Sequence, residues 1–196
     1  MKFAEYLQTV LARRAPLPDA AAHAKHAASG LITEVGELMD PFKRFLAYAK
    51  PIDSVNVMEE CGDYMWYLIL FADSVAIHMA ALQKSFDEDS SVARDMKDAD
   101  DFMVVTSLTF LSSSLAIAAA DLTALANRDV SSDDVLDLVT SAACVIQLLL
   151  ARHGYTMDEC LDRNDAKLAL RTAQKRAEMA GRDLAAERKA LEGDAA

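Results

Sequence analysis

Glu34-Val-Gly-Glu37 and Glu60-Cys-Gly-Asp63 are the two stretches that decide how this chain is expected to fold. In each stretch two carboxylates lie three residues apart, and on an α-helix this spacing places both side chains on one face. Two such helices facing each other would bring four carboxylates into one small volume. Like charges at that density repel one another, so a divalent cation with oxygen ligands is the usual reason for such convergence. Mg²⁺ is the first candidate for that ion.

Each acidic pair belongs to a longer stripe with helical spacing. The two stripes consist of His26, Gly30, Glu34 and Glu37, and of Asn56, Glu60, Asp63 and Tyr67. The opposite face of the first helix is apolar and carries Leu31, Val35, Leu38, Phe42 and Phe45. Each helix is therefore predicted to have one side for a core and one acidic side for a site. The alternative is that the four carboxylates are ordinary solvated surface charges, as a single Glu-x-x-Glu often is.

The composition favours an all-α protein of one large domain or two small ones. Of 196 residues, 53% are hydrophobic, and only 6 Gly and 4 Pro occur. The net charge of −11 argues against nucleic acid as a partner, although a metal-loaded acidic site can still accept a phosphorylated small molecule. Three cysteines without a Cys-x-x-Cys pair favour a reduced, cytoplasmic compartment, and no signal peptide is evident.

Residues 102–120 contain no charge and are nearly long enough to span a bilayer. Six Ser and Thr side chains interrupt the segment and lower its affinity for hydrocarbon. We therefore expect a buried core helix here and no membrane partner.

Local signals predict the order of the elements. A short amphipathic helix over Phe3–Arg14 precedes a second helix capped by Asp19, in which Asp40-Pro41 marks a kink or a new start. Asp53 or Ser54 caps the helix with the second acidic pair. Residues 84–101 form a polar connection or an exposed helix end. Helices follow over about 102–126 and 132–152, Gly154 ends the latter, and Thr156 or Asp158 begins another. Residues 172–196 are expected to form an exposed helix or a frayed tail.

The second half shows a weak internal repetition. Residues Leu115–Leu122 can be laid on Leu31–Leu38, and the following helix then overlays the one around Trp66. In that overlay Ala118 replaces Glu34, and no counterparts of Glu60 and Asp63 remain. We expect a single domain over 1–171, with a metal-site half at 15–83. Residues 102–171 are then either a degenerate second half or ordinary helices of similar composition.

Both acidic stretches resemble the motifs of MazG-like nucleoside triphosphate pyrophosphohydrolases, in the all-α group that also includes the dimeric dUTPases. Residues 26–40 are similar to the first motif, and residues 53–68 are similar to the second. A spacer of 22 residues, 38–59, falls within the family's range. Asn164-Asp-Ala-Lys167-Leu168 with Arg171 is similar to the closing helix. The family usually joins its second and third motifs over a short distance, whereas residues 73–152 intervene here.

The resemblance implies an antiparallel helix bundle that cleaves a nucleoside triphosphate between its α and β phosphates. It implies Mg²⁺, with Mn²⁺ as an alternative ion, held by Glu34, Glu37, Glu60 and Asp63. Glu37 or Glu59 would act as the general base. Asn164 would donate a hydrogen bond to the departing pyrophosphate, and Lys167 and Arg171 would neutralise its charge. A homo-oligomer, a dimer or more, is also implied.

Three residues on the acidic stripes are candidates for binding the nucleoside. Tyr67 can stack on a base, and Asn56 or His26 can read its edge. Their alternative role is packing between helices. The sequence does not select a base, so a role in removing damaged nucleotides and one in supplying a deoxynucleoside monophosphate both stand.

Two rival functions remain. A di-iron bundle needs Glu-x-x-His pairs, and this chain has none. The second rival is a non-catalytic helical interaction protein that retains an idle acidic site.

Overall fold

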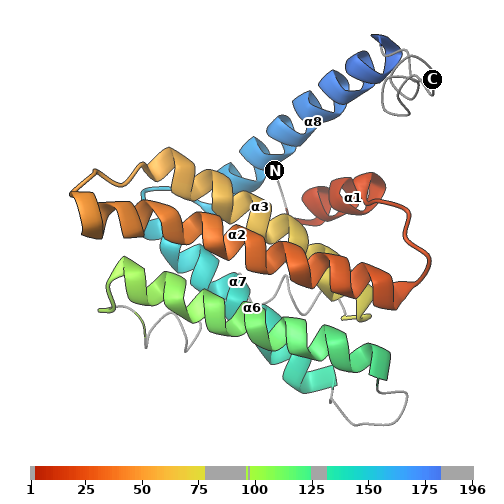
Figure 1. The fold of residues 1–196 in the computed structure, drawn as a ribbon, viewed down its shortest axis with the longest axis horizontal. Coiled ribbons are helices and arrows are strands. Elements are labelled where there is room, and N and C mark those ends of the chain that lie inside the picture. Colours follow the sequence, from red (N-terminus) through yellow and green to blue (C-terminus); the bar gives the residue numbers. More distant parts are fainter. Residues whose placement is uncertain (1–2, 78–95, 97, 125–131, 182–196) are drawn as a thin grey trace, which may run out of the picture. The chain divides into compact units, whose positions relative to one another are not determined.

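A computed structural model of the chain describes residues 3–77, 96, 98–124 and 132–181 (Figure 1). These residues form six α-helices and no strand, which confirms the predicted all-α class. The helices are α1 (Phe3–Arg13), α2 (Ala20–Tyr48), α3 (Ser54–Ser74), α6 (Asp101–Ala124), α7 (Ser132–Arg152) and α8 (Met157–Gly181). Most of the predicted polar connection at 84–101, and residues 182–196 of the predicted tail, lie outside the described residues.

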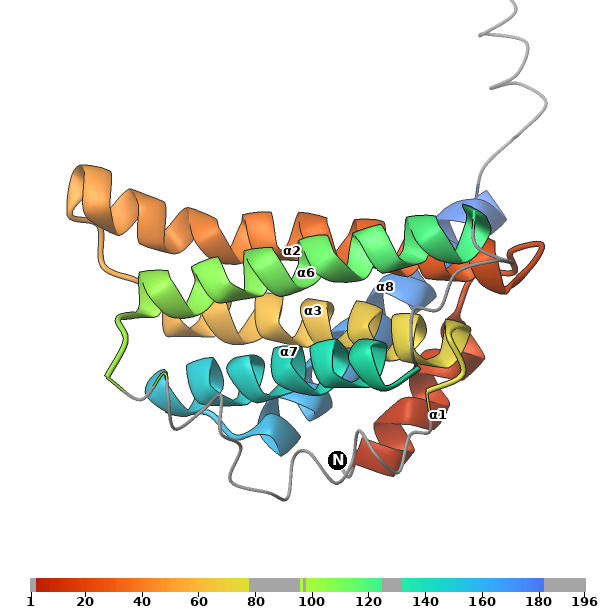
Figure 2. The ribbon, with the colours of Figure 1, turned by 90° about the horizontal axis from the view of Figure 1, so that it is seen from below.

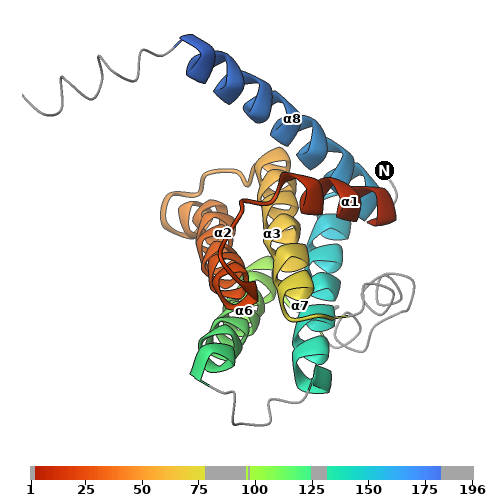
Figure 3. The same cartoon turned by 90° about the vertical axis from the view of Figure 1, so that its right-hand side faces the viewer.

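The chain divides into two compact units, Met1–Asn164 and Asp165–Ala196. In the first unit α2 packs against both α3 and α6, and α7 packs against the same two helices. The four helices therefore enclose a common core, which Figure 2 shows from the side and Figure 3 shows obliquely from one end. Helix α1 packs against α3. Among the largest fully buried side chains are Leu31, Leu38, Tyr64, Leu68, Phe71, Leu108, Leu115 and Ile146.

The helix ends follow the local signals in the sequence. Asp19 accepts a hydrogen bond from the backbone N–H of Ala22 at 2.8 Å and caps α2. Asp53, rather than Ser54, caps α3, because its Oδ1 accepts from the N–H of Val55 at 2.9 Å. Each cap satisfies a backbone donor that has no partner within its own helix. Gly154 follows α7 with a φ of +81°, a conformation that glycine adopts without a steric penalty.

Helix α2 runs through Pro41 without ending, so of the two predicted alternatives, a kink or a new helix, the structure excludes the new helix. Proline removes one backbone hydrogen bond from a helix interior, a loss that other contacts must offset. Phe42 is buried against the core, and the Asp40 carboxylate binds Lys43 Nζ at 2.6 Å and also pairs with Arg44. These contacts connect the turns on either side of Pro41, and the helix continues to Tyr48.

Helix α6 has one buried side and one exposed side. Val104, Leu108 and Leu115 are fully buried, and Ser112 hydrogen bonds to Tyr64 Oη at 3.0 Å. This side agrees with the expectation of a core helix. Within the described residues, Asp101–Ala120 and Asp133–Arg152 are long and apolar enough to cross a membrane, and 39% and 50% of these segments is buried in the protein. A core helix meets the same criterion, so these two segments are weak evidence for a membrane span.

Candidate metal centre

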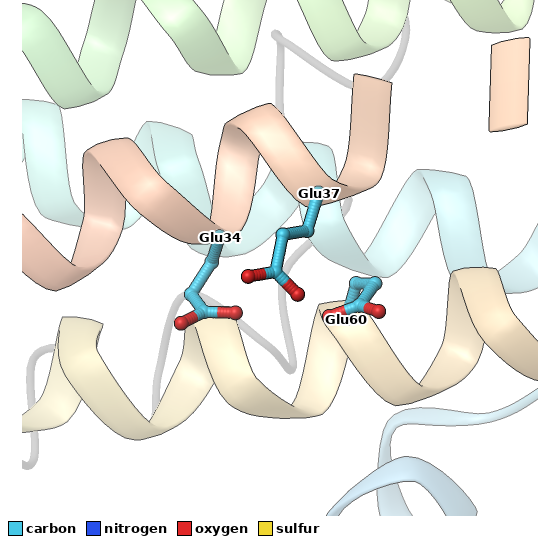
Figure 4. A group of neighbouring side chains, drawn as sticks. All are labelled: Glu34, Glu37 and Glu60. Carbon is cyan, nitrogen blue, oxygen red and sulfur yellow. The ribbon is translucent and has the colours of Figure 1, made fainter. Parts of the chain in front are cut away.

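Helices α2 and α3 bring three of the predicted carboxylates together. One carboxylate oxygen each from Glu34, Glu37 and Glu60 lies within 4.8 Å of the other two. Figure 4 shows the two side chains of α2 and the one of α3 directed toward the same space between the helices. Their burial is graded, because Glu37 is exposed while Glu34 and Glu60 are half-buried. The cluster is therefore open to solvent on one side and walled by helices on the other.

The electrostatics of Glu60 reflect this crowding. Burial raises the pKa of the Glu60 carboxyl, and the charges of Glu37, Asp63 and Glu59 raise that pKa further. The Asn56 amide opposes the shift by donating a hydrogen bond to Glu60 Oε1 at 2.8 Å. Without a cation, the ionised form of Glu60 is therefore disfavoured by its surroundings. Asn56 fixes the orientation of one oxygen of this carboxylate.

The donor set suits a hard cation. Three carboxylates are the oxygen ligands that Mg²⁺ and Mn²⁺ prefer. Oxygens on opposite sides of a Mg²⁺ ion lie roughly 4 Å apart, given bonds of about 2.0–2.1 Å. Atoms within 4.8 Å of one another can reach such an arrangement by small side-chain rotations. The residues present therefore fit the ion.

Asp63, the fourth predicted ligand, lies one turn beyond Glu60 and is not among the mutually close oxygens of the described residues. Its Oδ1 accepts a hydrogen bond from Asn164 Nδ2 at 2.6 Å. Asp63 is nevertheless near the cluster, since its charge contributes to the raised pKa values of Glu60 and Tyr67. It therefore occupies the edge of the site, with one oxygen committed to Asn164.

Asn164 belongs to a buried chain of hydrogen bonds, called here the relay, that the sequence did not reveal in full. Its side chain is 3% exposed, and its Oδ1 accepts a hydrogen bond from Tyr6 Oη at 2.6 Å. Gly62 makes room for it, because a Cβ at that position would lie 2.9 Å from Asn164 Cβ. The relay links α1 to the acidic edge of α3 through Tyr6, Asn164 and Asp63. Sequence reasoning missed Tyr6, since a tyrosine on an amphipathic helix looks like an ordinary core aromatic.

Tyr67 and His26 meet beside the carboxylates. Their rings lie 5.8 Å apart in an edge-to-face arrangement. Gly30 makes this possible, because a Cβ there would lie only 2.2 Å from Tyr67 Cδ1. Burial raises the pKa of the Tyr67 hydroxyl, and the charges of Glu34, Asp63 and Glu37 raise it further. Tyr67 is half-buried and His26 is exposed, so the pair borders the site as two of the predicted nucleoside contacts.

Glu59, Lys167 and Arg171 are the predicted site residues that remain. Glu59 is half-buried on α3 next to Glu60. Lys167 and Arg171 lie on α8 within the second compact unit, where Lys167 is half-buried and Arg171 is exposed. The roles expected for these three residues stay predictions.

Comparison of this chain with protein-family models, curated proteins and solved structures finds no match. The assignment of a function therefore depends on the residues and their geometry.

Proposed function

We propose that this protein is a metal-dependent nucleoside triphosphate pyrophosphohydrolase. The observation that carries the proposal is the convergence of Glu34, Glu37 and Glu60 from two helices. It is supported by the edge-to-face pair of His26 and Tyr67 beside those carboxylates. The motifs that resemble the MazG-like enzymes contain all five of these residues.

In the proposed reaction, water adds to the α-phosphorus of a nucleoside triphosphate. The bond between that phosphorus and the oxygen bridging the α and β phosphates breaks. The products are a nucleoside monophosphate and pyrophosphate, and the proton of the water passes to a carboxylate. A bound Mg²⁺ supplies charge neutralisation and lowers the pKa of a bound water.

The protein's own side chains would bind the ion, accept the proton, stack on the base and neutralise the leaving group. Glu34, Glu37 and Glu60 would hold the ion, and Asp63 would complete the acidic edge. Glu37 or Glu59 accepts the proton, since both lie on the acidic sides of α2 and α3. Tyr67 offers a ring face on which a base can stack, with His26 next to it. Lys167 and Arg171 are the proposed cations for the leaving pyrophosphate.

We assign the fold, within the same proposal, to an antiparallel bundle of the all-α pyrophosphatase type. Helices α6 and α7 would be a second, degenerate copy of the pair α2 and α3. The packing of α2 on α6 and of α3 on α7 supports this pairing. Ala118, which overlays Glu34, is buried, as expected for a former site position that now fills the core.

The experiment is a panel of ribo- and deoxyribonucleoside triphosphates, including dUTP and 8-oxo-dGTP, incubated with the protein and Mg²⁺. Pyrophosphate and monophosphate are expected in equal amounts, with no free phosphate. Glu37→Gln and Asp63→Asn should abolish turnover while the helical circular dichroism stays unchanged. Asp137→Asn, an exposed carboxylate on α7, serves as the matched control and should retain full activity.

Two results would contradict the proposal. One is turnover that survives both substitutions, which would place the chemistry elsewhere. The other is the absence of cleavage across the whole panel, which would favour a helical interaction protein with an idle site.

A further inference from the structure

The outward side of α6 carries an uncharged stripe, which we call the α6 stripe. It consists of six exposed residues, at alternating steps of three and four: Met103, Thr106, Phe110, Ser113, Ile117 and Ala120. Three of them are large and apolar, with exposed fractions of 58% for Met103, 72% for Phe110 and 65% for Ile117. Steps of three and four along a helix form the seam by which helices pair in coiled coils. Large apolar side chains gathered on one exposed face commonly mark an interaction surface.

The sizes of these residues alternate along the stripe. Large side chains at Met103, Phe110 and Ile117 are separated by small ones at Thr106, Ser113 and Ala120. When a second copy of α6 is laid against the first in the opposite direction, the symmetry axis passes between Leu111 and Ser112. Met103 then lies opposite Ala120 of the second copy, Ile117 opposite Thr106, and Phe110 opposite Ser113. Every large residue meets a small one, which is the condition for close packing across a symmetric interface.

Two hollows beside α6 lie where the large side chains of a second copy would arrive. One, of about 460 Å³, is bordered by Met103, Thr106 and Phe110 together with Ser141 and Val145 of α7. It lies at Thr106, which Ile117 of the second copy would face. The other, also about 460 Å³, is bordered by Ala116, Ala119 and Ala120 together with Ile32 and Lys25 of α2. It lies at Ala120, which Met103 of the second copy would face.

Charge also favours this face over the rest of the surface. The chain carries a net charge of −11, so two copies repel each other at low ionic strength. The segment from Phe102 to Ala120 contains no charged residue. Asp101, at the start of α6, is held by Arg152 at 3.0 Å. The six residues of the α6 stripe therefore bring no like charges together across the axis. Helix α6 has no Lys or Arg for anionic lipid headgroups, which makes a membrane surface a poorer occupant than a second copy.

We propose that two copies of this protein associate along the α6 stripe as an antiparallel, two-fold symmetric dimer. The proposal is independent of the catalytic one, because the stripe lies on a different helix from the carboxylates. It assigns each contact across the axis to a specific pair of positions.

Sedimentation equilibrium of the full chain tests the association. A concentration-dependent dimer is expected for the wild type. Phe110→Glu places two like charges near the axis and should raise the dissociation constant by about a hundredfold or more. Phe45→Glu, at an exposed aromatic residue of α2, is the matched control and should leave the dimer intact. Circular dichroism verifies that both variants remain helical.

A size exchange tests the register. Phe110→Ser and Ser113→Phe should each weaken the dimer, because one leaves a gap and the other creates a clash. The double variant carrying both changes restores a large residue opposite a small one and should recover most of the affinity. A double variant weaker than either single variant would overturn the proposed register.

Crosslinking tests the direction. Residues 106 and 117 lie 11 residues apart on one helix, roughly 16 Å at 1.5 Å per residue, so they cannot bond within a chain. Thr106→Cys combined with Ile117→Cys should give a covalent dimer on oxidation, whereas Thr106→Cys alone should not. A covalent dimer formed by Thr106→Cys alone indicates a parallel pairing and overturns the proposal. A wild type that stays monomeric, or that binds neutral phosphatidylcholine vesicles as a monomer, overturns it as well.

Discussion

Replacing Gly30 with alanine tests how closely Tyr67 lies on α2. An added Cβ would lie 2.2, 2.3 and 2.4 Å from Tyr67 Cδ1, Cε1 and Cγ, well inside van der Waals contact. All three atoms belong to the phenol ring, so the whole ring must rotate away from α2. Rotation would also break the edge-to-face contact with His26.

Gly36 provides an internal standard on the same helix. A Cβ at Gly36 meets nothing within 4 Å, so Gly36→Ala should stabilise the protein by about 0.5–1 kcal/mol through helix propensity alone. Gly30→Ala gains the same propensity but adds an overpacking cost of about 1–3 kcal/mol. The difference between the two variants cancels propensity and isolates the steric cost. For a chain of this length it corresponds to a difference in melting temperature of about 2–4 °C per kcal/mol.

Thermal unfolding followed by circular dichroism measures both variants under identical conditions. A double variant, Gly30→Ala with Tyr67→Ala, removes the clashing ring and should remove the extra cost of the alanine at position 30, measured as a coupling energy. Equal stability of Gly30→Ala and Gly36→Ala would refute the reasoning. It would mean that the Tyr67 ring does not lie against α2 as the structure has it.

Three further predictions concern the site and the core. Glu60→Gln should stabilise the metal-free protein by about 1 kcal/mol, the Coulomb repulsion in water of two charges that lie within 4.8 Å of each other. Burial and nearby carboxylates raise the pKa of Glu60, so the wild type gains stability from this group as pH falls through that pKa. The Gln variant should lack this gain in thermal unfolding measured across pH, and an identical pH profile would contradict it. Tyr6→Phe leaves the buried Oδ1 of Asn164 without its donor and should cost about 1–3 kcal/mol in urea unfolding, whereas a neutral effect would argue against the relay. The three cysteines form no disulfide and are buried, and burial raises the pKa of the Cys61 thiol well above its usual range. Iodoacetamide should therefore modify them only in denaturant, as mass spectrometry of the native protein can check.

Local features of the fold could be predicted because they depend on neighbouring residues alone. Asp19 was predicted to cap one helix and Asp53 or Ser54 another, and Asp19 and Asp53 are the caps in the structure. Gly154 was predicted to end one, and it adopts the positive φ for which glycine is suited. For Pro41 the same reasoning left a kink and a new helix open, and the choice depends on tertiary packing, since α2 continues and buries Phe42 in the core.

The site was predictable in its spacing but not in its details. Helical periodicity placed Glu34 and Glu37 on one face, and the amphipathic pattern of α3 directed Glu60 toward them. The hydrogen bond from Asn164 to Asp63 depends on the approach of residues 101 positions apart in sequence. No local pattern encodes such an approach. Gly62 lies between two carboxylates in the sequence, but its role in making room for Asn164 depends on the three-dimensional structure.

The most direct test of the account is a titration of the metal-free protein with Mn²⁺, in which electron paramagnetic resonance measures the free ion. The account predicts saturable binding that Mg²⁺ displaces. Binding should be lost when Glu34, Glu37 and Glu60 are all replaced by glutamine and retained in Asp137→Asn. Undiminished binding by the triple variant, or none by the wild type, would contradict the claim that these three carboxylates converge to hold a divalent cation.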